Sequence, residues 1–146
     1  GATHTVDPEE EDPMAFVESL TDGTMADTAI YTGSLGDAES LGEAYSTVGN
    51  RGELISVASN TLEVDHIDFP VEAGGVNQFT FGEREARGTL YGGWSPRHAI
   101  PTLLDMYEKG DLPLDDLVTG TYAIDGVNDA FDDMLKGNNI RGVLEL

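Results

Sequence analysis

Apolar and polar residues follow two periods along this chain, one typical of helices and one typical of strands. Asp12 and Pro13 predict the start of a first helix, because aspartate caps helix N-termini and proline suits the first helical position. Residues 26–31 are short, apolar and β-prone, and they predict a strand that ends in turn residues. The apolar face of the first helix consists of Met14, Val17 and Leu20.

The following segment repeats the alternation of helix and strand. We expect Asp37 to cap a second helix, and Gly49 and Gly52 to end it. Residues 54–58 then predict the next buried strand. Between residues 59 and 81 the pattern dissolves, and we expect a long loop that can hold short elements. The apolar face of the second helix would comprise Leu41, Ala44, Tyr45 and Val48.

The rest of the chain predicts two strands and two helices. A strand over residues 85–91 is followed by a helix that begins at Ser95-Pro96 and ends at Lys109-Gly110. Asp125 is expected to cap a last helix, and residues 141–146 to form the closing strand. The residues expected to face inward are Ile100, Leu103, Leu104 and Tyr107 in the first helix, and Val127, Ala130, Phe131, Met134 and Leu135 in the second.

Strands that alternate with helices over short connections predict an α/β fold with a parallel sheet, rather than a helical bundle. The pattern corresponds to half of a doubly wound sheet. With 146 residues, 39% of them hydrophobic, the chain can form one compact domain or a piece of a larger one.

The charge narrows the possible partners. A net charge of −21 makes nucleic acid and anionic membranes poor partners, because both are polyanions. The apolar periodicity argues against disorder, so we expect the acidic residues to form a solvated layer over a folded core. Two interpretations of the charge stay open, a protein from a salt-saturated cytoplasm and an acidic interaction module.

The sequence offers little for metal chemistry. It has no cysteine, which excludes disulfides and thiolate zinc ligands in this chain, and His4, His66 and His98 do not have metal-binding spacing. It has no apolar run long enough for a bilayer and no signal peptide, so a cytoplasmic location is expected. The chain opens at Gly1 without a methionine, which leads us to expect a piece of a longer protein.

Candidate binding chemistry lies at three strand ends, because ligands bind beyond the carboxyl ends of parallel strands. These ends are residues 31–34, 57–60 and 91–94. Their glycines would let a flat cofactor ring approach the main chain, although ordinary turns give the same pattern. Arg141, one of five arginines, begins the predicted last strand. It suits either a pyrophosphate or a surface ion pair.

Residues 88–146 carry four segments in a recognisable order: G-T-L-Y-G-G-W, I-P-T-L-L-D-M-Y-E-K-G, L-V-T-G-T-Y and I-D-G-V-N-D-A-F-D-D-M-L-K-G-N-N-I-R-G-V-L-E-L. This order resembles the tail of zinc-containing alcohol dehydrogenases of the medium-chain superfamily, closest to the class III-like branch with its glutathione- or mycothiol-dependent formaldehyde dehydrogenases. The opening G-A-T-H-T-V-D-P-E-E-E-D-P and the later L-T-D-G-T-M-A-D resemble part of that family's coenzyme domain, whereas residues 61–79 match poorly. With the acidic composition, the resemblance suggests a haloarchaeal source.

The resemblance implies an organisation and a set of contacts. Residues 1–94 would be part of a Rossmann domain for a nicotinamide cofactor, NAD or NADP. Residues 95–146 would be the C-terminal helices and strand that complete the coenzyme domain and return into the catalytic domain. The implied contacts are Thr32 and Gly33 with the coenzyme ribose, Ser59 near the nicotinamide, the main chain of Tyr91 with the carboxamide, and Arg141 with the pyrophosphate. Ser34 and Ala58 depart from residues common in the family.

The same resemblance implies hydride transfer between the cofactor and an alcohol, or an aldehyde-thiol adduct, with zinc polarising the oxygen in the intact enzyme. In the family, the zinc ligands and the glycine-rich phosphate loop precede the position of Gly1. We therefore expect this chain to hold no catalytic residue and no zinc ligand, and to be inactive alone. A homodimer through the strand over residues 86–90 is also implied. The alternative is a stand-alone, non-catalytic binding or oligomerisation domain derived from a dehydrogenase.

Overall fold

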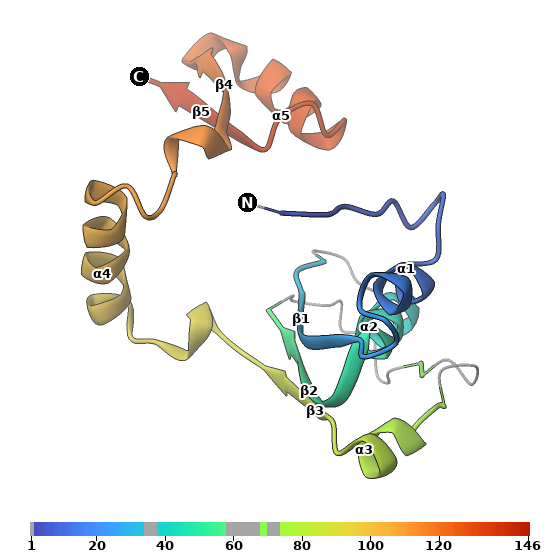
Figure 1. Ribbon diagram of the computed structural model, residues 1–146. Helices are drawn as coiled ribbons and strands as arrows, with labels where there is room; N and C mark the ends of the chain where they lie inside the picture. The colour runs from blue at the N-terminus through green and yellow to red at the C-terminus, as the bar shows by residue number, and fades with distance from the viewer. Residues whose placement is uncertain (1, 34–37, 58–67, 70–73) are drawn as a thin grey trace. The chain divides into compact units, whose positions relative to one another are not determined.

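The computed structural model describes residues 2–33, 38–57, 68–69 and 74–146. The chain divides into two compact units, Gly1–Gly93 and Trp94–Leu146, which Figure 1 shows and which are described here one at a time. Among the described residues, no helix is long and apolar enough to cross a membrane.

A three-stranded parallel sheet organises the first unit. Its elements, in chain order, are α1 (Pro13–Leu20), β1 (Ala26–Tyr31), α2 (Ala38–Ser46), β2 (Val48–Ser56), α3 (Asn77–Gly82) and β3 (Glu85–Gly88). The strand order is β1-β2-β3, and both pairs of neighbours are parallel. Tyr31 pairs with Ser56, and Ser56 pairs with Gly88, so the three strands end in a row. The predicted α/β class with a parallel sheet is confirmed.

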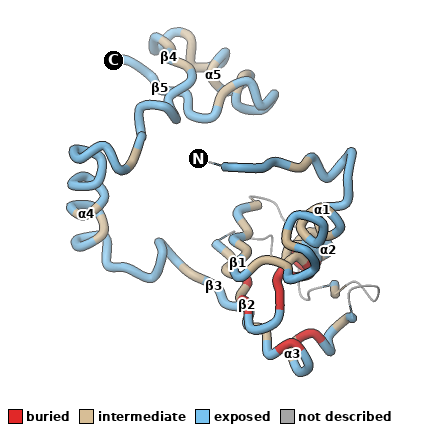
Figure 2. Tube along the Cα trace, in the orientation of Figure 1, coloured by how far each residue is buried: buried red, intermediate tan, exposed pale blue. Residues whose placement is uncertain are grey.

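The core of this unit lies between α2 and the sheet. Tyr45 of α2 is 0% exposed, and it packs with Leu41, Val48 and Leu54. Its ring stacks on that of Phe79 at a centroid distance of 4.7 Å. In Figure 2 buried residues are seen on β2 and α3, and Leu41, Gly42, Tyr45 and Ser46 of α2 are buried as well.

The start of α1 confirms the sequence prediction, because Asp12 is its N-cap and accepts a hydrogen bond from the main-chain N–H of Met14 at 2.9 Å. The assignment of Val48 to the second helix is wrong, since α2 ends at Ser46 and Val48 begins β2. Asp37, its expected cap, lies outside the described residues.

Gly49 and Gly52 lie within β2, so their predicted role in ending the helix is also wrong. They allow β2 to approach β1 closely. A Cβ atom on Gly49 would lie 2.4 Å from the carbonyl oxygen of Thr24, and one on Gly52 would lie 2.8 Å from that of Asp27. The strand predicted over residues 54–58 therefore begins at Val48 and ends at Ser56.

Strand β3 is shorter than the predicted strand over residues 85–91. It ends at Gly88, and residues 91–93 form a 3₁₀ turn. Helix α3 begins inside the segment over residues 59–81 that was predicted as a long loop able to hold short elements, and it ends one residue beyond it. Its six residues are too few for an apolar period to emerge, and no side chain caps its N-terminus.

The second unit combines helices with a pair of parallel strands. Its elements are α4 (Pro96–Glu108), a 3₁₀ turn (Asp115–Leu117), β4 (Val118–Ala123), a second 3₁₀ turn (Ile124–Gly126), α5 (Val127–Leu135) and β5 (Arg141–Glu145). Val118 pairs with Arg141, and Tyr122 pairs with Leu144. β4 was not predicted. Asp125 is not the cap of α5, because it lies in the 3₁₀ turn and Gly126 takes the N-cap position.

Most of the residues predicted to face inward in α4 and α5 are exposed, contrary to the prediction, although Val127 and Ala130 of α5 are half-buried. Ile100 of α4 is 57% exposed and Leu135 of α5 is 79% exposed. No residue between 94 and 146 is fully buried. The helical period was recognised correctly, but within this unit no further layer covers these faces.

Candidate functional site

Two of the predicted cofactor-binding segments leave the same edge of the three-stranded sheet. The main-chain N–H of Val57 donates to the carbonyl oxygen of Tyr31, and that of Thr89 donates to the carbonyl oxygen of Ser56, each at 3.0 Å. Residues 32–33 and 89–93 therefore both follow the carboxyl edge, with β2 between them. Ligands of parallel α/β sheets bind at this edge.

Thr32 and Gly33 come directly after β1. Thr32 is exposed, whereas Gly33 lies against the side chain of Tyr31. A Cβ atom on Gly33 would stand 2.7 Å from the Tyr31 hydroxyl, so a larger residue would require this ring to shift. Ser59, the predicted contact after β2, lies outside the described residues.

Tyr91 follows β3 in a left-handed conformation, with φ of 50°. This conformation costs a residue with a Cβ atom roughly 1–2 kcal/mol, and such strain is often found at functional sites. Gly92 and Gly93 continue the turn with φ of 69° and 76°. No atom of a described residue lies within 4 Å of a Cβ placed on Gly92, so a flat ligand could reach the main chain there.

Arg141 begins β5 in the second unit and is exposed. It makes no ion pair with a described residue, although the chain has 28 acidic residues. Four other basic side chains do pair with carboxylates: Arg51 with Glu83, Arg87 with Glu53, Lys109 with Asp105 and Lys136 with Asp132. Within the described part of the chain, the ion-pair interpretation of Arg141 therefore has no support.

A mainly apolar groove of about 180 Å³ lies beside Arg141, between α5 and β5. Its apolar lining includes Phe131, Met134 and Leu144, and Asn139 and Arg141 are its polar members. The lining of the groove thus includes one cationic side chain.

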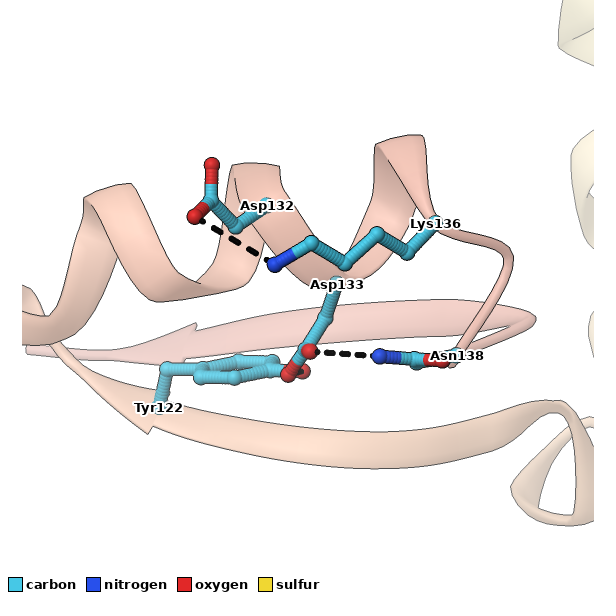
Figure 3. Close-up of polar contacts among 5 residues, drawn as sticks. All are labelled: Tyr122, Asp132, Asp133, Lys136 and Asn138. Atoms are coloured by element: carbon cyan, nitrogen blue, oxygen red, sulfur yellow. Dashed lines mark hydrogen bonds and ion pairs between the residues drawn. The ribbon is translucent and has the colours of Figure 1, made fainter.

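A polar network holds the turn that precedes Arg141. The Tyr122 hydroxyl donates to Oδ2 of Asp133 at 2.9 Å, and the Asn138 amide donates to Oδ1 at 3.0 Å; Figure 3 shows these side chains. Nδ2 of Asn139 donates to the Tyr122 hydroxyl at 2.9 Å. The hydrogen bond from Asn138, and then that from Tyr122, holds the pKa of Asp133 below its ordinary value. Sequence reasoning missed this network because its members come from three different segments.

The described residues do not fit the zinc ion that the resemblance implies. Among them, no group of three or more histidine, aspartate or glutamate side chains is placed to hold a metal ion. His66 lies outside the described residues. No chemical step is therefore assigned to zinc in this chain.

Comparison with known proteins gives the class to which these features correspond. No protein-family model matches the chain. Individual proteins match it over its whole length, and they are alcohol dehydrogenases.

Alcohol dehydrogenase B from Mycobacterium tuberculosis is 34% identical over 144 residues, which are 99% of this chain and 37% of that protein. Alcohol dehydrogenase class-3 from Myxine glutinosa is 30% identical over 148 residues, covering 100% of this chain and 37% of its own length. The crystal structure of benzyl alcohol dehydrogenase from Acinetobacter calcoaceticus aligns with a TM-score of 0.86 and 29% identity, over 100% of this chain and 38% of that one. The chain thus spans little more than a third of the relatives that it matches.

These relatives confirm the predicted resemblance to alcohol dehydrogenases. The class III-like branch and the haloarchaeal source stay predictions.

Proposed function

We propose that this chain supplies the C-terminal portion of an oxidoreductase that transfers hydride between NAD or NADP and an alcohol or an aldehyde-thiol adduct. The observation that carries this proposal is the continuous match of the whole chain to about 37% of alcohol dehydrogenase B. The fold supports it, because benzyl alcohol dehydrogenase has the same arrangement at a TM-score of 0.86. Residues 1–94 would belong to the coenzyme domain, and residues 95–146 would complete the coenzyme and catalytic domains.

Within this proposal the cofactor supplies the hydride chemistry, and the protein binds and orients it. Thr32 and Gly33 would contact the ribose, Ser59 would lie near the nicotinamide, and the main chain of Tyr91 would bind the carboxamide. Arg141 would bind the pyrophosphate. The Arg141 guanidinium, which makes no ion pair with a described residue, supports this role, since arginine binds phosphate oxygens with two parallel hydrogen bonds. The strained turn at Tyr91 supports the proposed contact between its main chain and the carboxamide.

The first test is activity of the purified chain with ethanol or benzyl alcohol and either nucleotide. We expect no alcohol-dependent reduction, because the phosphate loop and zinc ligands of the family have no counterpart in this sequence. Robust turnover by the chain alone would contradict the proposal that it is one portion of the enzyme.

The second test is binding of NAD and NADP, followed by NMR of the main-chain amides. We expect shifts at residues 32–33, 89–93 and 141. Arg141→Ala should weaken binding by about tenfold or more, as loss of a charged hydrogen bond implies. Arg97→Ala is the matched control, because Arg97 is exposed and makes no ion pair with a described residue. Equal losses in the two variants would contradict the role of Arg141.

A homodimer through β3 is the proposed assembly. β3 is an edge strand of the described sheet, and all four of its residues are exposed. An unpaired edge can add a strand from a second copy. Sedimentation velocity in molar potassium chloride should show a monomer–dimer equilibrium. A monomer at every protein concentration contradicts this assembly.

A stand-alone binding or oligomerisation domain is the second candidate function. The exposed β3 edge and the uncovered apolar face of α4 favour it. The DNA upstream of the Gly1 codon separates the two candidates. An open frame encoding C-x-x-C and G-x-G-x-x-G supports the dehydrogenase portion, whereas a start codon at that point supports the stand-alone domain. The cytoplasmic location and the exclusion of nucleic acid and membrane as partners stay predictions in either case.

A further inference from the structure

We infer that Asp133 is a positioning residue for Arg141, acting through Tyr122 and the turn over residues 137–140. The inference rests on the proposed function in one respect, because that function supplies the phosphate that the Arg141 guanidinium would bind. The geometry that carries it is independent of that function and lies entirely within the second unit.

The residues before Arg141 form hydrogen bonds with two elements, β4 and α5. The main-chain N–H of Ile140 donates to the Thr119 hydroxyl of β4 at 2.8 Å. The amide of Asn138 donates to Asp133 of α5 at 3.0 Å. The turn that leads into β5 is therefore fastened to both the neighbouring strand and the preceding helix.

The residue after Arg141 is held by packing. A Cβ atom on Gly142 would lie 3.1 Å from Cε2 of Tyr122 and 3.2 Å from Nδ2 of Asn139. A Cβ atom on Gly120 would lie 2.9 Å from the Tyr122 hydroxyl. The Tyr122 side chain thus lies against the main chain of both strands, next to Arg141, and its hydroxyl reaches Asp133.

Asp133 connects the Tyr122 side chain to the turn before Arg141, because an ionised carboxylate accepts hydrogen bonds at both oxygens and donates none. Oδ2 accepts a hydrogen bond from the Tyr122 hydroxyl, and Oδ1 accepts one from the Asn138 amide. No carboxylate among the described residues orients the Arg141 side chain. The main chain on either side therefore fixes the point from which the Arg141 side chain extends, and this order lowers the entropic cost of binding a phosphate.

The direct test compares Asp133→Ala and Asp133→Asn with the wild-type chain. Asp132→Ala is the matched control, because Asp132 is the neighbouring carboxylate and, among the described residues, forms an ion pair only with exposed Lys136, at 3.6 Å. Hydrogen exchange of the Ile140 and Arg141 amides, and ¹⁵N relaxation of the Arg141 Nε–H group, report the order of the turn. Thermal melts verify that each variant is folded.

We expect Asp133→Ala to accelerate amide exchange at these two residues by about tenfold, since local opening then breaks fewer hydrogen bonds. Asp133→Asn, which keeps one acceptor oxygen, should recover part of the protection, and Asp132→Ala should change nothing. Unchanged exchange and relaxation in folded Asp133→Ala would overturn the inference.

Titration with ADP links the positioning to phosphate binding. Asp133→Ala should weaken ADP binding by roughly three- to tenfold, but should add no further loss in a chain that already carries Arg141→Ala. An equal further loss in that background would show that Asp133 does not act through Arg141. If the wild-type chain binds no ADP, the proposed role of Arg141 fails for this chain, while the exchange measurement still decides the positioning.

Discussion

Gly42 of α2 lies directly against the main chain of Asp68, so that a Cβ atom on Gly42 would stand 1.5 Å from the Asp68 carbonyl oxygen. The N–H of Asp68 also donates to the carbonyl oxygen of Ala38 at 3.1 Å. This attachment brings Phe69 to the buried Tyr45, where the two rings meet edge to face at 5.2 Å. The core of the first unit therefore depends on a helix glycine.

Gly42→Ala should destabilise the first unit. Alanine favours a helix over glycine by about 1 kcal/mol, but relief of the contact requires movement of the Asp68 main chain, at a cost of about 1–3 kcal/mol or more. Urea unfolding followed by tyrosine fluorescence measures the change. The control is Gly126→Ala, where the nearest atom to the new Cβ lies 3.9 Å away. Equal stability of wild type and Gly42→Ala would show that the approach of Asp68 is not tight.

Tyr45→Phe should raise the free energy of unfolding by about 1 kcal/mol, because a buried polar group without a hydrogen bond carries a desolvation cost. The Tyr45 hydroxyl is buried and has no hydrogen-bond partner among the described residues. Burial raises the pKa of Tyr45, while the nearby Arg84 lowers it. Phenylalanine keeps the stack on Phe79 and removes only the hydroxyl. A less stable Tyr45→Phe variant contradicts this prediction, and Tyr45→Ala provides the comparison for loss of the ring.

The Asp133 carboxyl should titrate below its ordinary pKa of 3.8 in the folded chain. Since the folded-state pKa is lowered, this group stabilises the fold above pH 3.8, and the contribution is lost as the pH falls through the lower folded value. Carboxyl ¹³C NMR measures the midpoint. Asn138→Ala should raise that midpoint more than Tyr122→Phe, because the Asn138 hydrogen bond is the larger cause. A wild-type midpoint at or above 3.8 contradicts the network.

The ends of α1 and α4 that are marked by a proline or a glycine in the sequence were predicted correctly. Prolines placed the starts of α1 and α4, and Gly110 follows α4 with φ of 80°. Val48 shows the limit of such reasoning. It continues the apolar face of α2 at helical spacing, yet it belongs to β2. That outcome depends on the close approach of β1 to Gly49 and Gly52, which no local pattern records.

The candidate site also has a part that could be predicted from the sequence and a part that could not. The end of β1 was predicted from a short apolar run and turn residues, whereas β3 ends three residues before the predicted end at Tyr91. Thr32, Gly33 and Tyr91 were proposed from the family resemblance. Their contacts with a cofactor stay predictions. The network around Asp133 could not be found, because Tyr122 and Asn139 lie 17 residues apart and β4 itself was not predicted.

The net charge of −21 should make the stability of the chain depend on salt. At 0.01 M salt the Debye length is about 30 Å, so carboxylates across the whole surface repel one another. At 1 M it is roughly 3 Å, and mainly near neighbours still interact.

The melting temperature should therefore rise with potassium chloride. If screening alone is responsible, most of the rise should occur below molar concentration. A gain that continues well beyond that range would show that salt also strengthens apolar burial or that the carboxylates bind hydrated ions. Repeating the melts near the sequence pI of about 4.1 provides the control, because the net charge is close to zero there and the salt dependence should shrink. A melting temperature that stays flat from low to molar salt at neutral pH would overturn the halophilic interpretation. The acidic surface would then be better explained as a docking face for a basic partner.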